Sequence, residues 1–199
     1  MVRRPLVLAS ASPARLRLLR DAGFHPEVVV SGVDESAVEA GDAWDLVQQL
    51  AAAKAHAVAA RCTDRDALVI GCDSMLLFEG EALGKASDAA EVIARWRRMR
   101  GRSGVLLTGH CVLDVGSGRD VQQVADTVVR FGQPSDEELT AYAATEEALA
   151  VAGPFTIDGR AAAFVEGIEG DAGNVIGVSL PLLRQMLAKL DVEMVSLWS

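Results

Sequence analysis

Aromatic residues, cysteines and long apolar runs are all scarce in this sequence. Phe, Trp and Tyr make up only 5% of the 199 residues, so the core must be built mainly from aliphatic side chains. The three cysteines are an odd and scattered set, which disfavours a disulfide framework and favours free thiols in a reducing compartment such as the cytoplasm. No apolar run is long enough to cross a bilayer, and we expect neither a signal peptide nor a membrane partner.

Positive charge is also in short supply, because the formal net charge is -9. A protein that holds a nucleic-acid polymer usually carries the opposite sign, so such a partner is not expected. The densest basic run, between residues 95 and 102, falls at the end of a predicted helix, where cations suit the helix dipole. We interpret it as a solvated helix end, and any anion site must use a few selected cations in a pocket.

Strand and helix signals alternate along the chain. Expected strands cover residues 6–9, 27–30, 67–71, 105–115 and 121–131, with another near 162–165. Expected helices cover residues 13–22, 44–61, 87–100, 135–144 and 180–190, the first capped by Ser12 and the third by Ser87. This order predicts an α/β fold with a mixed, twisted sheet and flanking helices. The length fits one domain over residues 1–199, with room for two lobes around a cleft.

Two cations lie where a core-facing helix would not choose them. Lys54 projects from the middle of the apolar stripe formed by Val47, Leu50 and Val58. It is either a lysine whose stem covers the core or a lysine that points into a cleft toward an anion. Arg15 lies in the first turn of its helix, where it opposes the helix dipole unless a negative group is near. It is either a surface arginine or part of an anion site at a helix N-terminus.

Two acidic points complete the unusual set. Asp73 follows an apolar strand, and ligand sites of α/β sheets lie at the carboxyl ends of strands. Asp34 and Glu35 lie in a predicted loop. Each acid could also be a turn or cap residue. Two separated carboxylates with several cations suit Mg²⁺ bound to substrate phosphates.

Familiar motifs of other enzyme classes fail in this sequence. The segment from Gly80 to Lys85 has the wrong glycine spacing for a Walker loop, and Ala86 replaces its Ser or Thr. The glycines after residue 166 do not form a dinucleotide fingerprint, and no serine nucleophile elbow is present. Neither the histidines nor the cysteines show the spacing of a zinc site.

Taken in order, short segments along essentially the whole chain resemble the Maf family of nucleotide pyrophosphatases. They are Leu8-Ala9-Ser10-Ala11-Ser12-Pro13, Arg15 with Leu18-Leu19, Val33-Asp34-Glu35, Leu50 to Lys54-Ala55, Gly71-Cys72-Asp73-Ser74, Gly84-Lys85, Thr108-Gly109, Ala152-Gly153, Ile157-Asp158-Gly159, and Asn174-Val175-Ile176-Gly177 before Leu180-Pro181. Each segment is weak alone, and their order and spacing together make the match specific.

The resemblance implies an elongated fold with a deep cleft, similar to the inosine triphosphatases, and a homodimer. It implies hydrolysis of nucleoside triphosphates to monophosphate and pyrophosphate, with Mg²⁺ or Mn²⁺, as house-cleaning of the nucleotide pool. By position, Asp73 looks like the catalytic base, and Glu35 with Asp73 like the metal-binding pair. The substrate-binding residues implied in the same way are Ser10, Arg15, Lys54, Ser74, Lys85 and Asp158.

Four positions depart from the branch of the family that cleaves dTTP and UTP. That branch has arginine, threonine, glutamine and often histidine where this chain has Ala14, Ser74, Asp158 and Gly104. A preference for dTTP or UTP is therefore not expected, and the pattern is more similar to the branch acting on 7-methyl-GTP. Asp158 could accept hydrogen bonds from a guanine and favour a cationic methylated base.

Two other classes of function stay open. The chain could be a non-catalytic nucleotide sensor, since the family is also linked to septum formation and cell division arrest. It could instead be a phosphohydrolase that releases orthophosphate from esters. The joint presence of Glu35, Lys54, Asp73 and Lys85 argues against an inactive site. The released product, pyrophosphate or orthophosphate, distinguishes a pyrophosphatase from another phosphohydrolase.

Overall fold

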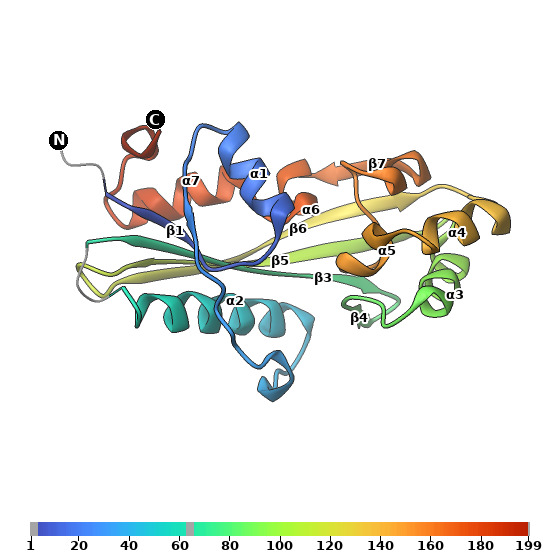
Figure 1. Ribbon diagram of the computed structural model, residues 1–199, viewed down its shortest axis with the longest axis horizontal. Helices are drawn as coiled ribbons and strands as arrows, with labels where there is room; N and C mark the ends of the chain where they lie inside the picture. The colour runs from blue at the N-terminus through green and yellow to red at the C-terminus, as the bar shows by residue number, and fades with distance from the viewer. Residues whose placement is uncertain (1–3, 63–65, 199) are drawn as a thin grey trace. The chain divides into compact units, whose positions relative to one another are not determined.

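A computed structural model describes residues 4–62 and 66–198 of the chain (Figure 1). The chain divides into two compact units, which are described separately. Unit 1 comprises Met1–Asp73, Thr108–Ala125 and Gly177–Ser199, and unit 2 comprises Ser74–Leu107 and Asp126–Ile176.

One seven-stranded mixed sheet has the order β2-β1-β3-β5-β6-β7, with β4 paired to β3. The strands are β1 (Leu6–Leu8), β2 (Glu27–Val28), β3 (Leu68–Phe78), β4 (Glu81–Leu83), β5 (Ser103–Asp114), β6 (Asp120–Phe131) and β7 (Val165–Gly170). Strand β1 is parallel to both β2 and β3, whereas β4 is antiparallel to β3 and β7 to β6. The mixed α/β class predicted from the sequence is confirmed.

The helices belong to one unit each. Unit 1 holds α1 (Pro13–Asp21), α2 (Ala43–Ala59) and α7 (Leu180–Lys189), with the 3-10 helices η1 (Glu35–Ala37) and η3 (Met194–Leu197). Unit 2 holds α3 (Ala89–Met99), α4 (Asp136–Ala143), α5 (Glu146–Ala150), α6 (Ala172–Ile176) and the 3-10 helix η2 (Arg160–Phe164). Among the described residues, no helix combines the length and the apolar character needed to span a membrane.

The core of unit 1 has two layers, one on each face of the sheet. Helices α1 and α7 cover one face and α2 covers the other (Figure 1). Strand β1 is buried along its whole length. This arrangement explains why β1 reads as a continuous apolar run rather than an alternating one, since both of its faces are covered.

The core of unit 2 is built around one tryptophan. Trp96 of α3 is fully buried, and its indole nitrogen donates a hydrogen bond of 2.8 Å to the carbonyl of Pro154. Its ring meets those of Phe131 and Phe164 edge to face, with centroids 5.5 and 5.6 Å apart. The scarce aromatics of the chain are thus concentrated here, in a geometry that aromatic rings favour.

Several expected boundaries are wrong. The strand expected at residues 67–71 extends to Phe78, so Asp73 lies within β3 and not at its end. The extension follows from Leu76 and Phe78, which are buried in the core of unit 2. The strand expected near 162–165 is the helix η2, and β7 begins only at Val165.

The starts of two helices were also not predicted correctly from the sequence. Asp88, not Ser87, is the N-cap of α3, because its carboxylate accepts the amide hydrogen of Glu91 at 2.8 Å. Ser87 instead donates through its backbone and its hydroxyl to the Glu91 carboxylate. Helix α5 was not predicted. It has no side-chain capping hydrogen bond, and its five residues are too few to show a helical periodicity of apolar residues.

Candidate active site

Two glycines let helix α2 lie directly on the sheet of unit 1. A Cβ atom on Gly71 of β3 would lie 2.2 Å from the carbonyl oxygen of Ala51, and one on Gly109 of β5 would lie 2.0 Å from that of Val47. Both distances are far shorter than any real contact, so only glycine permits this packing. The close approach fixes the height of α2 above β3, and with it the position of Lys54.

Lys54 connects two carboxylates. Its ammonium nitrogen lies 2.5 Å from Asp73 Oδ1 and 2.7 Å from Glu35 Oε1. Lys54 and Asp73 are only 8% and 7% exposed, whereas the Glu35 side chain is 56% exposed. The lysine head therefore points toward two carboxylates of the protein, and its contact with a substrate anion stays a prediction.

The environment of Asp73 changes its proton affinity. Burial raises the pKa of Asp73 above its ordinary value, against the opposing charges of Lys54 and Arg15. A carboxylate with a raised pKa binds a proton more readily than a solvated one. This is the property that a general base requires, and such shifts cluster at functional sites.

Arg15 lies on the same side of unit 1 as a second cation. Its guanidinium donates to the Ser10 hydroxyl at 3.1 Å, to the Cys72 carbonyl at 2.8 Å and to the Gly177 carbonyl at 3.1 Å. The Cys72 carbonyl immediately precedes Asp73, so these contacts bring Arg15 and Ser10 to the acidic group. Ser10 also accepts the amide hydrogen of Ser12, the N-cap of α1, at 3.2 Å.

The donor set at this point is suited to a hard divalent cation. Glu35 and Asp73 each place a carboxylate oxygen within 2.7 Å of the same ammonium nitrogen. Glu35 and Asp73 are thus close enough that both could hold one metal ion. Mg²⁺ and Mn²⁺ take oxygen ligands of this kind, together with substrate phosphates and water.

Within unit 1 the structure brings together Ser10, Arg15, Glu35, Lys54 and Asp73. The other three expected site residues belong to unit 2. Ser74 is partly buried in β3, Lys85 is exposed and pairs with Ala152 in an isolated β-bridge, and Asp158 is exposed just before η2. Their role in substrate binding stays a prediction.

Two contributors to the site were not assigned a role from the sequence. The carbonyls of Cys72 and Gly177 hold the Arg15 guanidinium. Gly177 has a positive φ of 123°, and a Cβ there would lie 2.8 Å from Arg15 Nε. Such roles belong to backbone atoms, so the only available signal was the presence of glycine itself.

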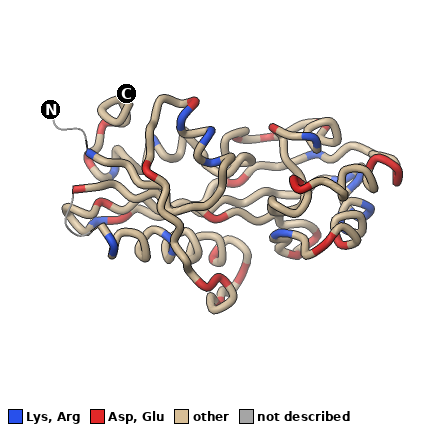
Figure 2. The backbone as a smooth tube through the Cα atoms, viewed as in Figure 1, with Lys and Arg blue, Asp and Glu red and all other residues tan. Residues whose placement is uncertain are grey.

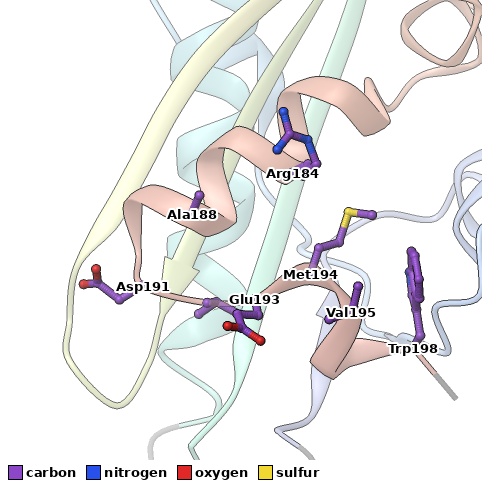
Figure 3. A pocket seen from close by; sticks show the side chains of 8 residues that line it. Arg184, Ala188, Asp191, Glu193, Met194, Val195 and Trp198 are labelled. Carbon is purple, nitrogen blue, oxygen red and sulfur yellow. The ribbon is translucent and has the colours of Figure 1, made fainter.

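A separate groove of unit 1 does not share these residues. It measures about 710 Å³ and runs along α7 and the segment that follows, with Arg184, Met194 and Trp198 among its lining side chains (Figure 3). The candidate site is instead assembled from α1, α2, η1, β3 and the loop after β1.

Comparison with known proteins gives consistent matches. A family model described as Maf-like protein matches residues 5–190. A protein of Streptomyces coelicolor is 60% identical over 197 residues, which cover 99% of this chain and 96% of the relative. A Salinispora tropica protein is 55% identical (98% and 87% covered), and a Synechococcus protein 50% identical (98% and 98% covered). All three are named nucleoside triphosphate pyrophosphatase.

Proposed function

The chain belongs to the Maf family, and from this premise we propose that it is a metal-dependent pyrophosphatase of nucleoside triphosphates. The reaction hydrolyses the bond between the α and β phosphates and releases a monophosphate and pyrophosphate. The observation that carries the proposal is the buried Lys54 held between Glu35 and Asp73. A buried ion pair offers little net stability, so its presence here favours a role in chemistry.

Asp73 is the proposed general base. Its burial and raised pKa favour uptake of a proton from the attacking water. Lys54, at 2.5 Å, keeps the carboxylate oriented and ionised until the proton moves. The pair thus holds the base ready in a partly desolvated position, where electrostatic interactions are stronger than in bulk water.

Arg15 and Ser10 are proposed to hold the phosphate chain. The guanidinium supplies several donors in a fixed plane, which suits phosphate oxygens. The N-terminus of α1 adds backbone amides and the positive end of a helix dipole beside them. These groups would balance the charge that develops on the leaving pyrophosphate. Ser74, Lys85 and Asp158 are proposed as further substrate contacts, as the family resemblance implies.

Glu35 and Asp73 are proposed to hold Mg²⁺ or Mn²⁺. When bound, the metal would polarise phosphate oxygens and neutralise their charge. The Lys54 ammonium, beside both acids, would supply a further positive charge to the same group.

The substrate is proposed to be a modified purine triphosphate of the 7-methyl-GTP kind rather than dTTP or UTP. Asp158 supports this choice because a carboxylate attracts a cationic methylated guanine. The residue is exposed and therefore accessible to a base. We also propose a cytoplasmic homodimer that cleans the nucleotide pool and contributes to division arrest, and a non-catalytic sensor of septation is the alternative.

The decisive experiment compares initial rates on dTTP, UTP, GTP and 7-methyl-GTP with Mg²⁺ or Mn²⁺. Chromatography would identify the products. Monophosphate with pyrophosphate is expected, fastest for 7-methyl-GTP and absent with excess chelator. Orthophosphate as the first product would indicate a different phosphohydrolase, and nucleotide binding without turnover would favour the sensor. A clear preference for dTTP or UTP would contradict the substrate proposal alone.

A further inference from the structure

Three side chains of different chemistry meet on the α2 side of unit 1. They are His56 of α2, Cys111 of β5 and Asp120 at the start of β6. One ligand atom from each lies within 4.8 Å of the others. The three residues come from three separate elements, so no local sequence spacing could predict the group.

The contacts converge on one oxygen atom. Asp120 Oδ2 lies 2.7 Å from His56 Nε2 and 4.0 Å from Cys111 Sγ, and it accepts the Gln122 amide at 2.9 Å. Burial opposes ionisation of Asp120, but the hydrogen bonds from Gln122 and His56 outweigh it and lower the pKa of this acid. An ionised carboxylate therefore lies at the centre of the group, which is the state a metal ligand needs.

We propose that His56, Cys111 and Asp120 form a binding site for Zn²⁺, distinct from the catalytic metal site. An imidazole, a thiolate and a carboxylate are the three protein ligands that Zn²⁺ accepts, whereas Mg²⁺ requires oxygen ligands alone. A water molecule completes the tetrahedron as the fourth ligand. The two sites therefore select different metals by ligand chemistry.

The three ligand atoms must shift before they can hold the ion. In tetrahedral zinc sites, neighbouring ligand atoms lie about 3.3–3.7 Å apart, as follows from the usual bond lengths. The separation of 4.0 Å between sulfur and oxygen must shorten, and that of 2.7 Å between nitrogen and oxygen must lengthen. The His56 side chain is 54% exposed, so it can rotate and provides the path by which the ion enters.

Cys111 must lose its proton to bind the ion. Burial raises the pKa of its thiol to about 12, so the metal-free side chain is a neutral thiol. A coordinated metal ion favours the thiolate strongly, and the displaced proton leaves to solvent. Binding of one Zn²⁺ therefore releases a proton from the thiol.

The site would tie α2 to the sheet. His56 is anchored on the helix, and the other two ligands are on neighbouring strands β5 and β6. Helix α2 also carries Lys54, two residues earlier, which contacts Asp73. Zinc would thus stabilise the element that positions the active-site lysine, without touching the active site itself.

Co²⁺, a spectroscopic substitute for Zn²⁺, provides the first test. The metal-free protein is titrated with Co²⁺ in excess Mg²⁺, which occupies oxygen-only sites. We expect a thiolate-to-cobalt charge-transfer band with one equivalent of Co²⁺, and its displacement by Zn²⁺. The band should vanish in Cys111→Ala. In His56→Gln the affinity for Co²⁺ should fall at least tenfold, and this variant should fold normally because it changes an exposed side chain.

Matched controls separate this site from others. Cys62→Ala removes a different buried thiol, and His25→Gln removes a different exposed histidine. Asp73→Asn removes the carboxylate of the proposed general base. All three should keep the cobalt band. A band that survives in Cys111→Ala, or disappears in Asp73→Asn, would place the bound metal elsewhere and overturn the proposal.

Thermal unfolding provides the second test. Zn²⁺ at a hundredfold excess over its dissociation constant should raise the Tm of the wild-type protein by roughly 5–10 °C. His56→Gln should lose most of this shift, while the Cys62→Ala control keeps it. No shift in the wild type, or an equal shift in His56→Gln, would show that the group is an ordinary ion pair beside a buried thiol.

Discussion

The two units of the molecule differ in the burial of their most closely paired charges. Unit 1 buries the pair of Lys54 and Asp73 beside a core of aliphatic side chains. Unit 2 carries ion pairs at the surface, where Arg97 of α3 and the nearby Arg100 contact Asp136 of α4. Figure 2 shows how the Lys, Arg, Asp and Glu residues are distributed along the chain. Because solvent screens exposed pairs and desolvation penalises buried ones, only the buried pair requires a functional explanation.

The two units also differ in how their cores are made specific. In unit 2, Trp96 and its ring neighbours fix the packing through edge-to-face contacts. In unit 1, the close approach of α2 at Gly71 and Gly109 does so without aromatic rings. The absence of a side chain can therefore fix the packing of a helix on a sheet as effectively as a large side chain fixes a core. Added bulk disrupts the first kind of packing, and lost bulk disrupts the second.

Replacement of the buried acid should have the largest effect. Asp73→Asn keeps the size of the side chain and removes its ability to accept a proton. We expect turnover of the preferred nucleotide to fall by roughly 10²–10⁴-fold, the usual contribution of a general base. Pyrophosphate release measures it, and retained nucleotide binding and circular dichroism show that the fold persists. Unchanged turnover would remove Asp73 from the mechanism and weaken the contrast between the two units.

Addition of one carbon at the helix–sheet contact should come next. Gly71→Ala places a Cβ atom against the Ala51 carbonyl, at 2.2 Å in the present packing, so α2 must move away. We expect a loss of about 1–3 kcal/mol in the free energy of unfolding, as for other overpacked cores. Turnover should also fall because Lys54 moves with the helix.

Gly41→Ala is the matched control for this change. Gly41 has no heavy atom within 4 Å of its would-be Cβ, and its φ does not require glycine. Urea unfolding of both variants should separate them clearly. Equal stability in the two variants would mean that the close approach of α2 does not need a glycine.

The same glycines illustrate what the sequence could predict. The order of elements, the residue pattern around Lys54 and the acids Glu35 and Asp73 follow from periodicity and family resemblance. The packing of α2 on Gly71 does not follow, because a glycine in a strand has several explanations. Nor does the extension of β3 beyond Asp73, which depends on the burial of Leu76 and Phe78 in the other unit. Both features depend on contacts between residues far apart in the sequence, which local sequence patterns do not report.

The pH dependence of stability can test the contribution of an exposed acid in unit 2. Hydrogen bonds from the Ser87 backbone and hydroxyl, with the nearby Arg95, lower the pKa of Glu91 to about 2 from 4.5. The ionised form is therefore the one that the fold favours. Its stabilising contribution is complete above pH 4.5 and is lost as the pH falls toward 2. Chemical unfolding of the wild type and Glu91→Gln should show a stability difference that shrinks across this window. A constant difference would mean that ionisation of Glu91 does not stabilise α3.

Removal of an exposed cation should have the smallest effect of all. Arg97 contacts Asp136 at 2.8 Å, but both side chains are 53% exposed, and Arg100 contacts the same carboxylate at 2.9 Å. Water and salt screen such a pair, and the second arginine remains to balance the acid in Arg97→Ala. We expect no change in Tm or turnover beyond measurement error, at low or high salt. A salt-dependent loss of stability would show that the surface charges of unit 2 act as a coupled network, and the contrast with the buried pair of unit 1 would then be one of degree.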